Sequence, residues 1–153
     1  MSKAEETCYL DASALVKRYV EEPRSETVDT IYRDAYRGVK RSSFSYWDVA
    51  EAVVVFDRYE RRIGLDPKKL VKGMLKEYMT LSRLSRLIVV NVSPQVLRAS
   101  MKLVLKHHIY VADALQIASV KKVNSRVMVT GDKGLADIAD AEGLKVLYVG
   151  THS

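Results

Sequence analysis

Two acidic residues each follow an apolar segment that is long enough to form a buried strand. Asp11 comes directly after the segment 8–10, and Asp132 follows the segment 127–130 after one glycine. In an open parallel sheet, ligands bind in the crevice outside the carboxyl ends of the strands, so both carboxylates are predicted to face one crevice. Each could instead cap the helix that follows it, and the helix dipole alone favours an acid such as Asp113 in a first helical turn. The strand ends therefore indicate a shared site and leave capping open for each residue.

Glu51 lies in the middle of a predicted helix, where capping does not explain an acidic residue. Its neighbours about one turn away on the helix surface are Trp47, Val54 and Val55. We expect Trp47 in the core, and a carboxylate in such an apolar stripe is costly unless it is paired or binds a metal. A salt bridge to an arginine, or a place at the edge of the stripe, explains Glu51 equally well. Asp48, on a neighbouring face of the helix, is the alternative if the helix phase differs.

Apolar periodicity predicts strands and helices in alternation along the whole chain. The predicted strands are residues 8–10, 38–43, 87–90, 127–130 and 146–149, and the predicted helices are 13–20, 25–36, 45–62, a helix from 66 towards 84, 93–106, 111–121 and 133–142. The second strand is ambiguous because Lys40 and Arg41 lie within it. Strand–helix alternation calls for an α/β fold with a parallel sheet covered by helices on both faces. No linker or repeat divides the chain, so we expect one domain over residues 1–153.

Bulk properties restrict the class of protein. The only cysteine is Cys8, so no internal disulfide is possible and nothing argues for secretion. The apolar run 52–56 is too short to span a membrane, and the first six residues include two acids, Glu5 and Glu6, where a signal peptide needs positive charge followed by an apolar stretch. We therefore expect a soluble cytoplasmic protein without a membrane partner. The formal net charge of +6 and the pI of about 9.4 favour polyanionic partners such as nucleic acids.

Four segments resemble successive blocks of the PIN-domain ribonucleases, and of the VapC-type toxins of type II toxin–antitoxin systems in particular. They are YLDASALVK at residues 9–17, SSFSYWDVAE at 42–51, ADALQIA at 112–118 and VTGDKGL at 129–135. Each block is short, but all four occur in order and at the separations usual in the family. The resemblance covers about residues 8–149. It implies a single three-layer PIN-like domain with a mainly parallel central sheet of four to five strands.

The resemblance also implies a site and a reaction. The acids at the matching positions, which would be both catalytic residues and metal ligands, are Asp11, Glu51, Asp113 and Asp132. Ser13 and Thr130 would orient carboxylates or waters, and Asp137 is a weaker candidate whose alternative role is an exposed surface acid. Such a cluster of carboxylates repels itself unless cations compensate, and its oxygen ligands suit Mg²⁺ or Mn²⁺. The implied activity is endoribonuclease cleavage by phosphodiester hydrolysis, leaving 5′-phosphate and 3′-hydroxyl ends.

The family likeness further implies partners. Besides the RNA substrate, we expect a small antitoxin that inserts a segment into the crevice, and a homodimer. Basic side chains around the crevice could bind the RNA backbone, although each alone is equally explained as solvated surface; the candidates are Arg33, Arg37, Lys40, Arg41, Arg58, Arg61, Arg62, Lys68, Lys69, Lys72 and Lys76.

Other functions compete with this hypothesis. A phosphatase of the haloacid dehalogenase type also has an Asp after its first strand, but it needs a second Asp where this chain has Ser13. A Walker-type phosphate loop is excluded by the spacing of Gly131 and Gly134. A non-catalytic PIN-like module that binds RNA or protein, and a housekeeping RNA-processing nuclease, both remain open.

Overall fold

The computed structural model describes residues 6–151, and its centre is a five-stranded sheet in which every strand pair is parallel. The strand order is β3-β2-β1-β4-β5. The strands are β1 (Thr7–Leu10), β2 (Arg41–Ser45), β3 (Leu87–Val90), β4 (Val127–Thr130) and β5 (Lys145–Tyr148). The N-terminal segment on which the signal-peptide interpretation depends lies largely outside the described residues.

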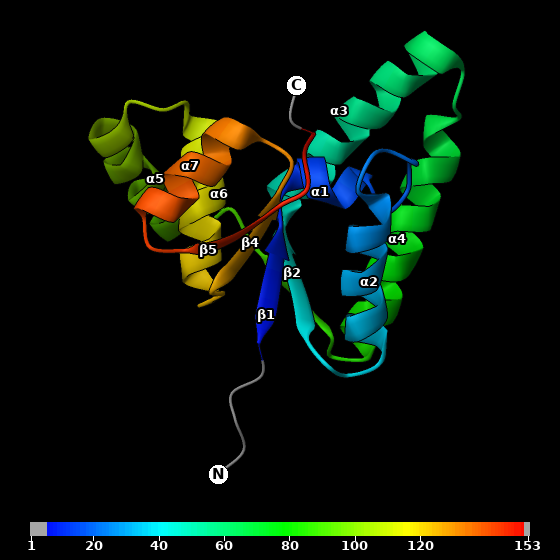
Figure 1. Cartoon of the computed structure of the whole chain (residues 1–153), viewed down its shortest axis with the longest axis horizontal. Helices are drawn as coiled ribbons and strands as arrows, with labels where there is room; N and C mark the ends of the chain where they lie inside the picture. The colour runs from blue at the N-terminus through cyan, green and yellow to red at the C-terminus, as the bar shows by residue number, and fades with distance from the viewer. Residues whose placement is uncertain (1–5, 152–153) are drawn as a thin grey trace.

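Helices cover both faces of this sheet (Figure 1). Those that pack on one face are α1 (Ala12–Val16), α2 (Ser25–Tyr36), α3 (Tyr46–Ile63) and α4 (Pro67–Arg83). Those on the other face are α5 (Pro94–His107), α6 (Val111–Lys122) and α7 (Lys133–Ala141). The predicted three-layer α/β fold with a parallel sheet is confirmed. Between residues 6 and 151, no helix combines the length and apolar character that crossing a bilayer requires.

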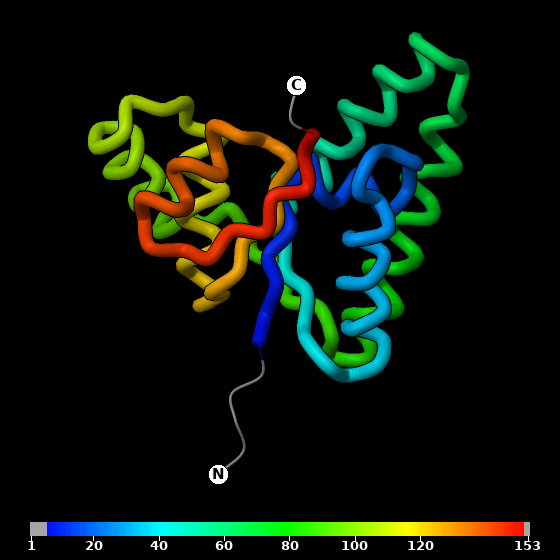
Figure 2. The backbone as a smooth tube through the Cα atoms, in the orientation of Figure 1, coloured from blue at the N-terminus to red at the C-terminus, as the bar shows by residue number. Residues whose placement is uncertain are grey.

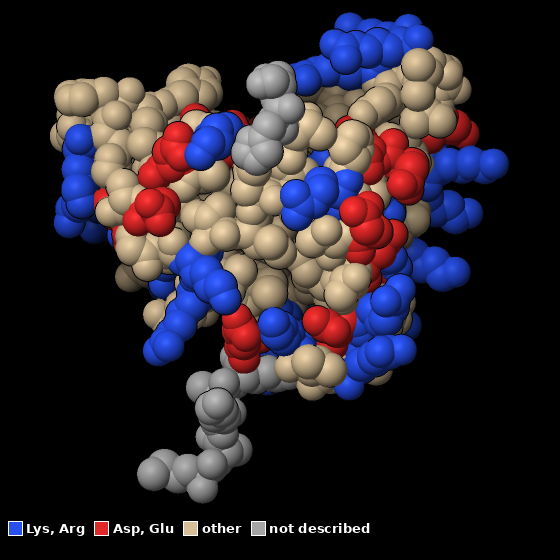
Figure 3. All heavy atoms as spheres, in the orientation of Figure 1, with Lys and Arg blue, Asp and Glu red and all other residues tan. Residues whose placement is uncertain are grey.

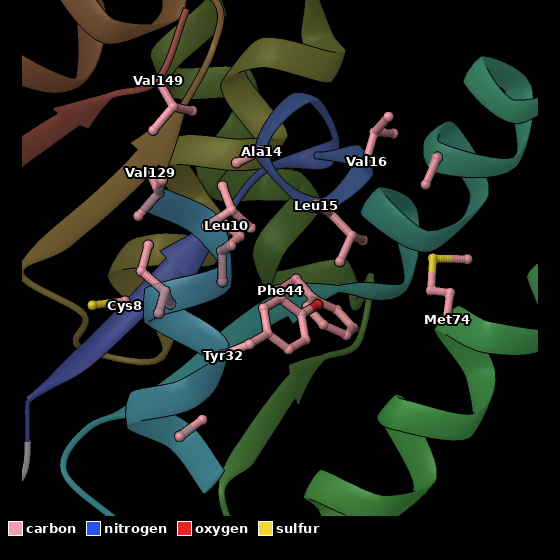
Figure 4. Packing of buried hydrophobic residues seen from close by; sticks show 14 of the residues in the cluster. Cys8, Leu10, Ala14, Leu15, Val16, Tyr32, Phe44, Met74, Val129 and Val149 are labelled. Carbon is pink, nitrogen blue, oxygen red and sulfur yellow. The ribbon is translucent and has the colours of Figure 1, made fainter. Parts of the chain in front are cut away.

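Side chains alternate between the two cores along each central strand. In β1, Cys8 and Leu10 pack among the helices α1–α4, whereas Tyr9 packs among α5–α7. In β4, Val129 belongs to the first core and Met128 to the second. Figure 4 shows Leu10 and Val129 on adjacent strands, close to α1. Because successive residues of a strand face opposite sides, both faces of a central strand must be apolar, which explains the unbroken apolar runs in the sequence.

The second strand begins later than the sequence predicted. The range 38–43 was expected, but α2 ends in a turn with Gly38 at φ 75°, and the strand is Arg41–Ser45. The strand lies between β1 and β3 although most of its residues are serines or basic. Ser43 is tolerated there because its hydroxyl donates to the carbonyl of Ile88 over 2.8 Å. A hydroxyl satisfied in this way can be buried at little cost.

The helix after β1 is shorter than the predicted range 13–20. It ends at Val16, and the chain then continues through turns in which Lys17, Arg18 and Tyr19 donate to the carbonyl three residues back. This tighter winding keeps α1 close to the carboxyl end of the sheet. Figure 2 shows α1 in blue beside the red segment that follows β5, and residues of both line one cavity.

Candidate active site

The carboxyl ends of β1 and β4 bring Asp11 and Asp132 to the same edge of the sheet. The two strands pair in register at Leu10 and Val129, so the residues that follow each strand emerge side by side. Asp11 is the N-cap of α1, and its Oδ1 accepts a hydrogen bond from the Ala14 N–H at 3.0 Å. Asp132 is the N-cap of α7. Both predicted roles, helix cap and strand-end acid, are therefore present at each position.

Asp11 is 4% exposed, and two hydroxyls fix its carboxylate. The Ser13 hydroxyl donates to Oδ1 at 2.6 Å, and the Thr130 hydroxyl donates to Oδ2 at 2.5 Å. Ser13 Oγ also accepts from the Gly131 N–H at 2.8 Å, so the loop after β4 is tied to α1. These contacts give Ser13 and Thr130 the geometry of residues that orient a carboxylate.

Burial makes the ionised form of Asp11 unfavourable. Loss of solvation raises its pKa to about 6, although its three hydrogen bonds act in the opposite direction, and the charge of Asp132 raises it further. Asp132 itself is exposed, with Oδ1 accepting from the Leu135 N–H at 3.1 Å and its own N–H donating to Thr130 Oγ1 at 3.0 Å. The charge of Asp132 is thus close enough to disfavour the ionised form of Asp11.

Asp113 and Glu51 extend the cluster from two helices. Asp113 lies in the first turn of α6, and its pKa is raised by partial burial and by the charge of Asp132. Burial also raises the pKa of Glu51; the Trp47 indole and the Gln116 amide oppose this shift, and the charge of Asp113 adds to it. The charge of Asp132 therefore acts on both Asp11 and Asp113, and the charge of Asp113 acts on Glu51. The four carboxylates come from distant parts of the chain, since Asp11 and Asp132 are 121 positions apart in the sequence.

The surroundings of Glu51 differ from the expectation. Trp47 was expected in the core, but it is 40% exposed, and Val54 is 53% exposed. Glu51 therefore lies at the edge of the buried surface, where its carboxylate accepts from Gln116 Nε2 at 3.3 Å on α6. Asp48, the alternative to Glu51, is completely buried and forms a capping box with Ser45 at the start of α3.

Asp137 lies away from the buried acids. It is exposed, and it accepts a hydrogen bond from Lys133 Nζ at 2.7 Å, one helical turn earlier on α7. This i,i+4 ion pair is ordinary for a solvent-facing helix and favours the surface role for Asp137.

Two buried residues near Glu51, Tyr9 and Gln116, were not identified from the sequence. The Tyr9 hydroxyl contacts Asp48 Oδ2 at 2.7 Å and Gln116 Oε1 at 2.9 Å. The two contacts span 39 and 107 positions of the sequence, so no local sequence pattern predicts them. The one available signal was polarity: Gln116 lies within the mostly apolar run 114–120 of α6, and it is only 3% exposed.

The chemistry of the donors fits a hard divalent cation. The carboxylates offer only oxygen, and the pKa values of Asp11, Glu51 and Asp113 are raised first by burial and then by the charge of a neighbouring acid, a charge that a bound cation would offset. Within residues 6–151, no three Asp, Glu, His or Cys side chains are arranged around a common point as metal ligands are.

Comparison with known families and structures gives a consistent result. The PIN domain family model matches residues 8–141, which is most of the chain. No curated protein matches the sequence.

Solved structures with the same fold come from several bacteria. VapC20 of Mycobacterium tuberculosis, described as a toxin that cleaves the sarcin-ricin loop, has a TM-score of 0.62 and 15% identity over 90% of this chain and 95% of its own. VapBC2 of Rickettsia felis, solved with a DNA fragment from its promoter, has a TM-score of 0.60 and 15% identity over 93% and 98%. FitAcB of Neisseria gonorrhoeae has a TM-score of 0.56 and 20% identity over 92% and 96%. The chain therefore belongs to the PIN domain family, and its structural neighbours include VapC toxins of VapBC toxin–antitoxin systems.

Proposed function

We propose that the protein is a divalent-metal-dependent endoribonuclease that hydrolyses phosphodiester bonds of single-stranded or structured RNA. The observation that carries this proposal is the coupling of Asp11, Asp132, Asp113 and Glu51 at the carboxyl end of the sheet. A cluster of partly desolvated acids is unfavourable as mere structure and is the kind of site at which perturbed pKa values accompany function. Membership of the PIN domain family supports the same activity.

In this proposal the four acids hold Mg²⁺ or Mn²⁺, and Ser13 and Thr130 keep the Asp11 carboxylate turned towards the cluster. When bound, such an ion supplies an acidified water and stabilises charge that develops on the phosphate. The protein's own contribution is to orient the Asp11 carboxylate by hydrogen bonds at 2.5 and 2.6 Å and to exclude water from it by burial.

Basic side chains offer a surface for the RNA backbone. Figure 3 shows Lys and Arg side chains gathered over the tip of α3 and along the outer edge of α4. Lys68, Lys72 and Lys76 are exposed on one face of α4, and Arg61 and Arg62 are exposed near the end of α3. We propose that these residues contact phosphates, so binding should weaken as salt increases.

The test is cleavage of an end-labelled single-stranded RNA in the presence of Mg²⁺ or Mn²⁺ and in excess EDTA. We expect cleavage only with the metal, giving 5′-phosphate and 3′-hydroxyl ends. Cleavage that persists undiminished in excess EDTA would contradict the proposal. RNA binding and metal binding without any cleavage would favour the alternative, a non-catalytic PIN-like module.

We further propose that this nuclease is a toxin controlled by a small antitoxin. The toxin–antitoxin complexes among its structural neighbours support this role. A groove of about 760 Å³ between α3 and α4 has an apolar floor that includes Val53, Val71 and Leu75, and Lys72 and Lys76 lie at its rim. Its chemistry suits an amphipathic partner helix with acidic flanks.

Expression in a bacterial host separates a toxin from a housekeeping nuclease. The toxin should arrest growth, and co-expression of a small protein encoded by the adjacent reading frame should relieve the arrest. Leu75→Ser should weaken that rescue without reducing cleavage by the free enzyme, because Leu75 lies in the groove and not in the acidic cluster, and serine leaves the charge beside Lys72 and Lys76 unchanged. Normal growth during expression of an active enzyme would favour the housekeeping alternative.

We also propose a homodimer that forms through α5. Leu97, Met101 and Leu105 are 38%, 58% and 77% exposed, and they lie at successive i,i+4 positions on one helix face. A second copy of the chain would cover this stripe. Light scattering should give a dimer for the wild type and a monomer for Met101→Glu. A dimer with a dissociation constant of about 1 μM forms at tens of micromolar protein. A wild type that stays monomeric at that concentration would contradict this proposal.

A further inference from the structure

A buried chain of hydrogen bonds lies behind Glu51 and links it to a second acid. Asp48 and Tyr9 are both 0% exposed, and Gln116 is 3% exposed. Tyr9 OH lies 2.7 Å from Asp48 Oδ2 and 2.9 Å from Gln116 Oε1, and Gln116 Nε2 donates to Glu51 Oε1 at 3.3 Å. The chain therefore runs from Asp48 through Tyr9 and Gln116 to Glu51. None of its first three members belongs to the acidic cluster itself.

Counting hydrogens along this chain gives the protonation of Asp48. The Gln116 amide donates through Nε2 to Glu51, so its Oε1 faces Tyr9 and must accept. The single hydroxyl hydrogen of Tyr9 therefore goes to Gln116. The remaining contact, at 2.7 Å between Tyr9 OH and Asp48 Oδ2, then needs a hydrogen from the carboxyl group. Asp48 is accordingly the neutral acid in this arrangement.

The surroundings of Asp48 also disfavour its ionised form. Its Oδ1 is buried and has no hydrogen-bond partner among residues 6–151, whereas Oδ2 accepts from the Ser45 N–H at 2.9 Å and from the Ser45 hydroxyl at 3.1 Å. The titratable groups that face it are Tyr9 and the acid Asp11, neither of which supplies positive charge. Burial is the largest cause that raises the pKa of Asp48, to about 7, and the charge of Asp11 contributes, while hydrogen bonds with Ser45, Tyr9 and Gln116 act in the opposite direction.

We propose that neutral Asp48, Tyr9 and Gln116 are positioning residues that set the direction of this hydrogen-bond chain, so that an amide N–H is presented to Glu51 as long as Asp48 is protonated. The inference rests on the proposed nuclease function, in which Glu51 must be an anion that points into the cluster. If Asp48 ionised, it would take the Tyr9 hydrogen, and Gln116 Oε1 would face an oxygen without a hydrogen between them. The amide would then turn and direct its oxygen at the Glu51 carboxylate, which repels it.

Removing the Tyr9 hydroxyl interrupts the chain while preserving the buried ring. In Tyr9→Phe we expect Mn²⁺ affinity, measured by calorimetry, to fall about tenfold, which is typical for loss of a residue that orients a metal ligand. Gln116→Met removes the amide and should give a similar loss, which keeps the test decisive if Tyr9→Phe does not fold. The matched control is Tyr19→Phe, which deletes a hydroxyl bonded to Tyr32 in the other core, and its affinity should be unchanged.

Carboxyl ¹³C shifts followed against pH in the metal-free protein test the hydrogen count directly. The wild type should show Asp48 protonated at pH 6. An Asp48 that is ionised at pH 5, or metal affinities of Tyr9→Phe and Gln116→Met equal to that of Tyr19→Phe, would overturn the inference. A wild type that fails to cut RNA would overturn the proposed function alone, because the titrations are measured without metal or substrate.

Discussion

At Asp11 the folded chain buries a carboxylate that has no cationic partner among the contacts that surround it. Its hydrogen-bond partners are the Ser13 and Thr130 hydroxyls and the Ala14 N–H, which only partly replace the lost water. Its pKa of about 6 records the remaining penalty. Natural sequences retain such a penalty mainly where the group has a function. A substitution at Asp11 is therefore expected to lower activity without lowering stability.

Asp11→Asn should abolish cleavage without unfolding the protein. Asparagine has the same shape and also caps helices, so α1 should persist. Removing the buried charge should leave the melting temperature at pH 7.5 equal to the wild-type value or higher. We expect at least about a hundredfold loss of cleavage rate, as is common when a group that acts on the reacting centre is removed. Wild-type activity in this variant would contradict the site.

The stability of the metal-free protein should fall as pH rises from about 4 to 7. Asp11 and Asp48 have folded-state pKa values of about 6 and 7, above their ordinary 3.8, so the unfolded chain releases these protons first. For Asp11 the loss amounts to about 3 kcal/mol at 1.4 kcal/mol per pKa unit. Glu142, with its pKa lowered to about 2, acts in the opposite direction, but mainly below this window.

Urea unfolding at a series of pH values measures this dependence. Asp11→Asn serves as the control, since it should show a smaller fall than the wild type over the same range. A wild-type stability that rises between pH 5 and 7 would contradict the burial of ionisable acids described here.

At the scale of elements, the same side chains both start helices and face the crevice. Asp132 caps α7 through its contact with the Leu135 N–H, and it also raises the pKa values of Asp11 and Asp113. The two roles can be separated because a serine caps a helix but carries no charge.

Asp132→Ser and Asp132→Ala should both lose cleavage activity, but only the alanine variant should lose the cap. We expect Asp132→Ala to be less stable than Asp132→Ser by about 1 kcal/mol, the usual value of an N-cap. Parallel denaturation and cleavage assays measure both effects. Equal stability of the two variants would show that the cap contributes little, and retained cleavage would remove Asp132 from the site.

The elements that the sequence predicted well are those whose apolar pattern is local. The strands 87–90 and 127–130 agree with the structure to the residue, since each is an apolar run of strand length. The strand Arg41–Ser45 was displaced because its burial depends on a satisfied hydroxyl contact with β3, which no periodicity records. Trp47 was misplaced for a related reason: an apolar side chain was taken as buried, whereas it is 40% exposed in the folded chain.

At the scale of the whole molecule, the parallel sheet is what gathers the candidate site. Asp11 and Asp132 could be predicted because strand ends of a parallel sheet share an edge, and Glu51 and Asp113 because the sequence blocks around them resemble the PIN family. The buried contacts of Tyr9 could not, because they depend on how α3 and α6 pack across β1. Contacts between polar side chains that are distant in the sequence leave no pattern in the residues around either one.

Metal binding should stabilise the whole fold. An ion that binds only the native state raises the free energy of unfolding by about 2.7 kcal/mol at a hundred times its dissociation constant. We therefore expect Mg²⁺ or Mn²⁺ to raise the melting temperature of the wild type at pH 7.5 by several degrees and to have little effect on Asp11→Asn. An equal shift in both proteins would indicate nonspecific ion binding to other surface acids.

The most direct test of the central claim is anomalous diffraction from crystals of the wild-type protein grown at pH 7.5 and soaked in Mn²⁺. We predict an anomalous peak at the carboxyl ends of β1 and β4, within coordination distance of Asp11 and Asp113, with no such peak in crystals of Asp11→Asn. Saturating Mn²⁺ that leaves this edge of the sheet without a peak, or that binds only at distant surface acids, would contradict the account.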